Sequence, residues 1–231
     1  NRLDVDAGYL SPAAARWFGA DGLPPAGFAR VEATPVVRRL PVTLGDGRRL
    51  DVVIVFFPPL PAPHPGHGAD HGADAESGRA GWPGPPDDMI ARVLAAARSA
   101  RERQDDTAGR RSASSQTDKI PTPKDADREL VVGISPWGFQ AERLALPRLA
   151  EMFHMILGAG EGAPLTAEAP EDAPSVLWSR ADVDGRGVIV LDVLAPPGPG
   201  QTWDPTAATW AREIEIAPPL PVDPEMERLL Q

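Results

Sequence analysis

The sequence predicts an α/β sandwich with mixed sheets, and three observations support this fold class. An apolar run, a helical pattern and a second apolar run follow one another over residues 130–157, the order of a strand–helix–strand unit. Gly45-Asp46-Gly47 separates two apolar runs, as in an antiparallel hairpin. Residues 188–194 and 210–216 alternate in polarity, which predicts a further antiparallel pair.

The composition limits the classes of function. The chain has 231 residues, a formal charge of −10, 42% hydrophobic residues and no cysteine. The apolar content is enough for a core, and the missing thiols exclude disulfides, zinc–thiolate sites and iron–sulfur clusters. The acidic balance argues against a nucleic-acid partner. The longest apolar run, Val52 to Phe57, is too short to span a bilayer.

We expect one domain over residues 1–231, with loop insertions at about 58–86 and 104–127. The first insertion is rich in Pro, Gly, Ala, His and Asp, a composition that builds no core. The expected strands cover residues 28–33, 36–44, 50–57, 130–134, 155–157, 176–179, 188–194 and 210–216. The expected helices begin at Ser11, at Asp87 or Asp88 (ending near Arg103), at Gln140 and at Asp223.

Two turns that follow predicted apolar strands are candidates for a catalytic or a phosphate-binding site. Ser135 follows the first, but Pro136 removes a backbone donor that a nucleophile elbow would need. The turn at residues 158–162 is glycine-rich, yet no Lys-Ser/Thr pair follows as in a phosphate-binding loop. A tight turn with positive φ is the favoured interpretation. Asp182, Asp184 and Asp192 could act in acid–base chemistry or bind a hard cation. Asp184-Gly185 before a strand is more simply a turn.

The chain resembles 5'-nucleotidase-type metallophosphoesterases. Residues 128–138 are similar to the family segment in which a strand ends in a Ser-His-x-Gly-like turn, and residues 155–160 to the next strand, which ends in Gly-Gly-His-x-His. Residues 185–193 and 223–226 resemble the late strand and the closing Asp-Pro-Glu segment. The resemblance implies a metallophosphoesterase-like α/β sandwich, incomplete at the N-terminus because the first two family motifs would precede Asn1. It also implies a periplasmic or secreted location.

The departures from this family concern its two metal ions. The family's histidines would fall on Pro136 and within residues 158–162, and its Asn-His-Glu near residues 6–9, where no histidine stands. Proline and glycine have no side-chain donor for a metal. The resemblance therefore implies a degenerate metal site in a non-catalytic binding or structural module, with no catalytic residue. A residual substrate pocket is expected at Ser135, Trp137, Gly160 and Glu161.

Two alternatives remain open at this point. An active metal-dependent phosphoesterase would need ligands from a preceding segment, with Asp6, Ser135 and Glu161 completing the site. A periplasmic metal-binding protein would use the His-rich loop, in which acidic residues accompany His64, His67 and His71; a solvated spacer explains the same loop. A divalent metal is thus a possible cofactor. Missing first strands would also expose a sheet edge, which predicts a homodimer or a partner that covers it.

The metal-binding alternative predicts a calorimetric signal. Titration of the protein with Zn²⁺ or Ni²⁺ should release heat, because neutral imidazole binds these ions. Replacement of His64, His67 and His71 by alanine should abolish the heat. No heat from the unchanged protein would rule this alternative out.

Overall fold

The computed structural model describes residues 8–10, 28–30, 33–45, 47–61, 84–114, 128–181, 187–198 and 202–215. The strands are β1 Gly8–Leu10, β2 Phe28–Arg30, β3 Val36–Thr43, β4 Arg49–Phe56, β5 Arg128–Ser135, β6 Met155–Gly158, β7 Leu165–Glu168, β8 Leu177–Arg180, β9 Gly187–Val193 and β10 Thr209–Glu215. The helices are α2 Asp87–Ser114, α3 Phe139–Leu149 and α4 Pro205–Ala208. The content is mixed α/β, as predicted.

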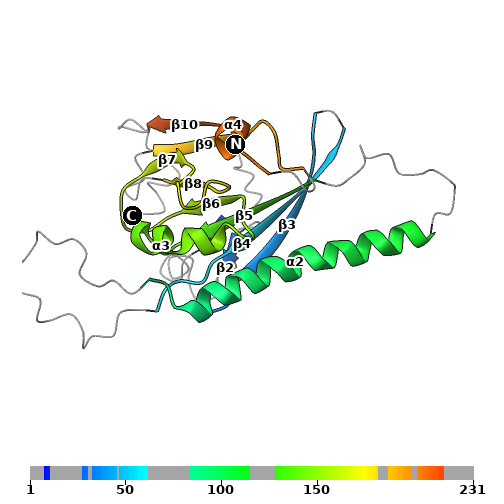
Figure 1. The fold of residues 1–231 in the computed structure, drawn as a ribbon, viewed down its shortest axis with the longest axis horizontal. Coiled ribbons are helices and arrows are strands. Elements are labelled where there is room, and N and C mark those ends of the chain that lie inside the picture. Colours follow the sequence, from blue (N-terminus) through cyan, green and yellow to red (C-terminus); the bar gives the residue numbers. More distant parts are fainter. Residues whose placement is uncertain are drawn as a thin grey trace, which may run out of the picture.

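A six-stranded mixed sheet forms the centre of the molecule (Figure 1). Its order is β3-β4-β5-β6-β8-β7, with β4, β5, β6 and β8 parallel and the outer strands β3 and β7 antiparallel to their neighbours. Two smaller pairs, β1 with β2 and β9 with β10, complete the strands described. The predicted mixed sheet is confirmed, whereas the specific metallophosphoesterase architecture stays a prediction.

The predicted hairpin joins β3 to β4. The amide of Leu44 donates to the Arg48 carbonyl at 2.8 Å, and Gly47 closes the turn with φ 80°. The next strand, β4, is apolar on both faces because both are covered. Val53 and Val55 pack on the helix side, while Ile54 and Phe56 pack on the other.

Both long helices cover one face of the central sheet. The apolar stripe of α2 is buried through Met89, Ile90, Val93, Ala97 and Ala100. The predicted end near Arg103 was wrong, since the helix continues to Ser114. Arginine, glutamate, glutamine and alanine all favour helix, so a polar composition alone does not end one. Figure 1 shows the second half of α2 running on past the sheet.

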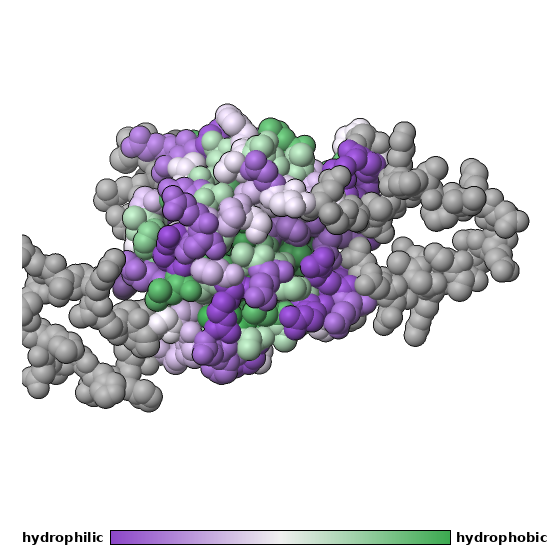
Figure 2. Space-filling view, viewed as in Figure 1, coloured by the Kyte–Doolittle hydropathy of each residue, from purple (hydrophilic) through white to green (hydrophobic). Residues whose placement is uncertain are grey.

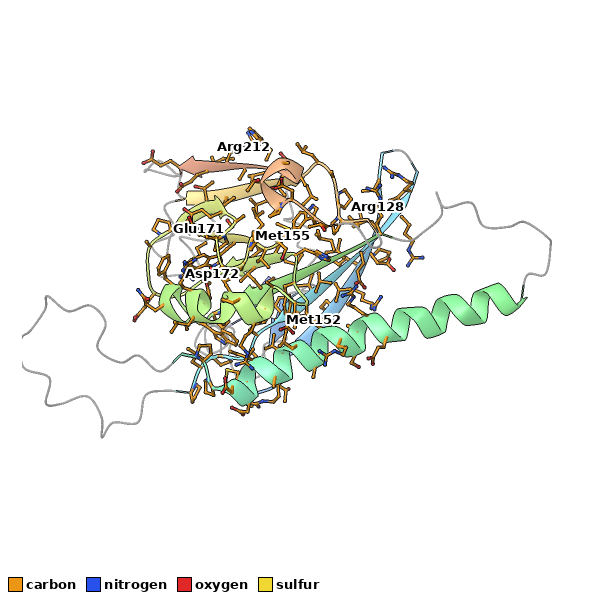
Figure 3. All side chains as sticks on the ribbon, viewed as in Figure 1. Arg128, Met152, Met155, Glu171, Asp172 and Arg212 are labelled. Atoms are coloured by element: carbon orange, nitrogen blue, oxygen red, sulfur yellow. The ribbon has the colours of Figure 1, made fainter. Side chains whose placement is uncertain are left out.

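The opposite face of the sheet packs against the β9–β10 ribbon and α4. Leu130, Met155 and Leu177 of the sheet meet Trp203 and Ala208 in a second apolar cluster. In Figure 3, Met155 lies inside the body and Arg212 on the outer strand of the ribbon. The register of β9 and β10 confirms the predicted antiparallel pair, while β7 and α4 were not foreseen.

Several predictions lie outside the described residues. They are the helices that begin at Ser11 and Asp223, the His-rich loop with its three histidines, and residues 115–127. The third predicted helix is confirmed and runs through Pro147. Within the described part of the chain, no helix is both long and apolar enough to cross a membrane.

His154 joins two strands at the amino edge of the parallel strands. Its Nδ1 atom accepts a hydrogen bond from the Val131 amide at 2.9 Å, and its own amide donates to the Val131 carbonyl at 2.9 Å. The ring meets Trp203 edge-on, with centroids 5.7 Å apart. Burial, assisted by the charge of Arg101, lowers the pKa of His154 to about 4. The ring is therefore neutral and structural at pH 7.

This shift of the His154 pKa predicts a loss of stability in mild acid. The imidazole binds a proton near pH 6.5 in the unfolded chain and only near pH 4 in the fold. The contribution of the neutral imidazole to the free energy of unfolding is therefore fully present above about pH 6.5. It falls by about 3 kcal/mol as the pH falls to 4, because the unfolded chain binds the proton more readily. The variant His154→Asn keeps a hydrogen-bond acceptor but does not titrate. Between pH 6.5 and 4, its free energy of unfolding in urea should therefore fall by about 3 kcal/mol less than that of the wild type. Parallel pH profiles would contradict the assignment.

Candidate functional site

The candidate site lies at the carboxyl edge of the parallel strands. Ser135, Gly158 and Arg180 end β5, β6 and β8, and the register places them side by side. Ligands of open α/β sheets bind outside this edge of the strands. The groups that stand there therefore decide what the protein can hold.

A fully buried ion pair occupies this edge. Arg180 donates from Nη1 to Oε2 of Glu142 on α3, and both side chains are 0% exposed. Nε1 of Trp178 donates to the same carboxylate oxygen at 3.0 Å. Burial raises the pKa of Glu142, and the guanidinium partly opposes that rise. Removing two charges from water is costly, so the site depends on these hydrogen bonds.

The other donors of Arg180 hold a segment that we call the strap, residues 159–163. Nη2 lies 3.3, 3.1 and 3.1 Å from the carbonyl oxygens of Ala159, Gly160 and Glu161. Nε lies 3.3 Å from the carbonyl oxygen of Ala163. One guanidinium thus organises the whole turn that follows β6.

The strap also covers the N-terminus of α3. The amides of Gly138 and Phe139 donate to the carbonyls of Ala159 and Glu161 at 3.2 and 2.8 Å. The amide of Ala159 donates to the Ser135 carbonyl at 2.8 Å. Free N–H groups at the start of a helix bind anions well. Here the strap carbonyls already accept from two of these amides.

Glycine is required in this turn for two different reasons. Gly160 and Gly162 have φ of 82° and 119°, which confirms the sequence interpretation of a tight turn. A side chain at Gly158 would overlap Oε2 of Glu142 and the Arg180 guanidinium. The glycines therefore allow a close approach of strap and ion pair.

The structure places the four predicted pocket residues at this one edge. Ser135 and Trp137 are buried at 0% and 4% exposure, whereas Gly160 and Glu161 are exposed. Ser135 Oγ accepts from the Trp137 amide at 3.2 Å, and Nε1 of Trp137 donates to the Pro58 carbonyl at 2.7 Å. Two of the four residues thus pack into the interior, and a substrate pocket here stays a prediction.

One carboxylate oxygen of Glu142, Oε1, is buried without a hydrogen-bond partner of its own in the described part of the chain. The nearby Ser135 hydroxyl lowers the Glu142 pKa, yet Oε1 has no hydrogen bond of good geometry among the described residues. Neither Glu142 nor Arg180 was singled out from the sequence. The sequence does contain one indication of Glu142. It shares a helical face with Ala145, Leu146 and Leu149, and a glutamate on an otherwise apolar face indicates a buried charge.

Other candidate groups are not brought together. His154 precedes β6 and Ser135 ends β5, so they stand at opposite edges of the sheet and form no triad. Asp182 and Asp184 lie outside the described residues, and Asp192 is exposed on β9. Across the described ranges, no group of three histidine, cysteine or acidic side chains could hold a metal ion.

A separate hollow of about 250 Å³ lies between the end of β9 and α4. Trp203 and a pair of prolines, Pro196 and Pro197, line it. Its acidic group, Asp204, already accepts from the amides of Thr206 and Ala207 as the cap of α4. In Figure 2 the visible surface is mostly hydrophilic, with apolar residues in separate small groups.

Comparison of the chain with protein-family models, curated proteins and solved structures finds no match. The site is therefore interpreted from its own chemistry.

The crowding at Gly158 predicts a strong effect of one added methyl group. Gly158→Ala should lower the free energy of unfolding by about 3 kcal/mol, because the new Cβ overlaps the buried ion pair. Gly45→Ala is the matched control, since nothing lies within 4 Å of its Cβ position. Urea unfolding measures both variants, and equal stabilities would contradict the packing described.

Proposed function

We propose that the chain is a metallophosphoesterase-like, 5'-nucleotidase-like domain with a degenerate metal site, acting as a non-catalytic binding or structural module. One observation supports this most strongly. At the carboxyl edge of β5, β6 and β8, backbone carbonyls and one carboxylate surround the Arg180 guanidinium. The Arg180 guanidinium, a positive charge, therefore occupies the edge at which an active enzyme of this kind would present metal-binding side chains.

The residues at this edge do not fit a two-metal centre. Such a centre needs several imidazole and carboxylate donors that hold the ions and a bridging water. The turns offer Pro136, Gly158 and Gly160, which lack donor side chains. Glu142, the buried carboxylate, accepts from Arg180 and Trp178. We therefore derive no catalytic step.

A binding role is consistent with the edges of the sheet. Among the described strands, β3 pairs with β4 alone, and we propose that a partner strand or a second copy pairs with its other edge. Arg38 on this strand is exposed. The proposal includes a periplasmic or secreted location, which rests on the family resemblance.

The proposal predicts no phosphatase activity. The purified chain should not hydrolyse a simple phosphate ester above the metal-only background when Mn²⁺ or Zn²⁺ is added. Turnover of about 1 s⁻¹ or faster would refute a non-catalytic module and favour an active phosphoesterase. Loss of that turnover in Glu161→Gln would then assign it to this edge, because Glu161 is the exposed carboxylate of the strap.

A further inference from the structure

The surroundings of Arg180 have the composition of a cation site. Five oxygen atoms accept its hydrogen bonds, one from Glu142 and four from the carbonyls of residues 159, 160, 161 and 163. Carboxylate and backbone carbonyl oxygens are the ligands that proteins offer to hard cations. In this protein the cation is a side chain, fully buried and fixed to β8.

We propose that the Arg180 guanidinium is a built-in cation that holds the strap closed over the carboxyl edge of the sheet. The strap then keeps its carbonyls on the first amides of α3, and this edge is closed in the resting protein.

Beyond its contacts with Arg180, the strap is joined to the body by backbone hydrogen bonds and by close packing of Gly162 on Phe139. All five of its residues are exposed, so apolar burial contributes little to its position. Three backbone hydrogen bonds join it to Ser135, Gly138 and Phe139. Hydrogen bonds from a charged group are stronger than those between neutral backbone groups. Arg180 supplies four donor contacts to the strap, which makes it the principal anchor.

Aromatic rings complete the enclosure of the guanidinium. Its central carbon lies 5.9 Å from the centroid of the Phe139 ring, and Phe139 packs on Trp178 with centroids 5.0 Å apart. The rings and the strap together keep water from the ion pair. A cation that is smaller or differently shaped would therefore not reproduce the same set of contacts.

The test removes the cation and then returns it. In the full chain, Arg180→Ala should lower Tm by about 10 °C, because Glu142 and four carbonyls lose their donor. Amide hydrogen exchange of Gly138 and Phe139 should rise by about tenfold or more, since the strap no longer covers them. Methylguanidinium at millimolar concentration should reverse both changes, whereas methylammonium or sodium should not.

Two further variants keep the test decisive. If Arg180→Ala does not fold, Arg180→Lys replaces it, because lysine keeps the charge but cannot span the carboxylate and the strap carbonyls. It should fold and still exchange faster at Gly138 and Phe139. Arg143→Ala is the control, since Arg143 is half-buried on α3 next to Glu142 and pairs with Asp172 at 3.3 Å. Unchanged exchange in the folded Arg180 variant, or equal recovery with sodium, would overturn the proposal.

Discussion

The pairing of Arg180 with Glu142 is the constraint on which the rest of the carboxyl edge depends. It joins the end of β8 to α3 and, through the remaining guanidinium donors, to the turn after β6. A buried pair of this kind is not in itself evidence of high stability, because desolvation consumes much of the attraction. Its contribution is geometric, since the turn places four carbonyl oxygens on the Nε and Nη2 donors of Arg180.

The glycines are consequences of this pair. Gly158 leaves room for the two charged groups, and Gly160 and Gly162 let the chain turn its carbonyls toward the guanidinium. From the sequence alone, a tight turn was favoured over a phosphate-binding turn at these glycines, because no Lys-Ser/Thr pair follows them. The structure supports the tight turn, because Gly160 and Gly162 have positive φ and the amide of Ala159 donates to the Ser135 carbonyl.

The sequence predicted the strands well because their apolar periodicity is local. The two-sided apolar run of β4 and the alternation of β9 and β10 each carry their own signal. The length of α2 was missed because its second half lacks an apolar stripe while keeping helix-forming residues. The ion pair was missed because its partners are 38 residues apart and meet only through the topology of the sheet.

The position of both long helices on one face of the sheet has a consequence for ligand binding. The chain moves from β4 to β5 and from β5 to β6 in one direction across the sheet, with α2 and α3 on the same side. A doubly wound sheet opens a crevice at its topological switch point, where successive connections pass to opposite faces. The connections between β4, β5 and β6 do not change face in this way. The loops at the carboxyl ends of these strands therefore do not diverge, and the backbone forms no crevice between them.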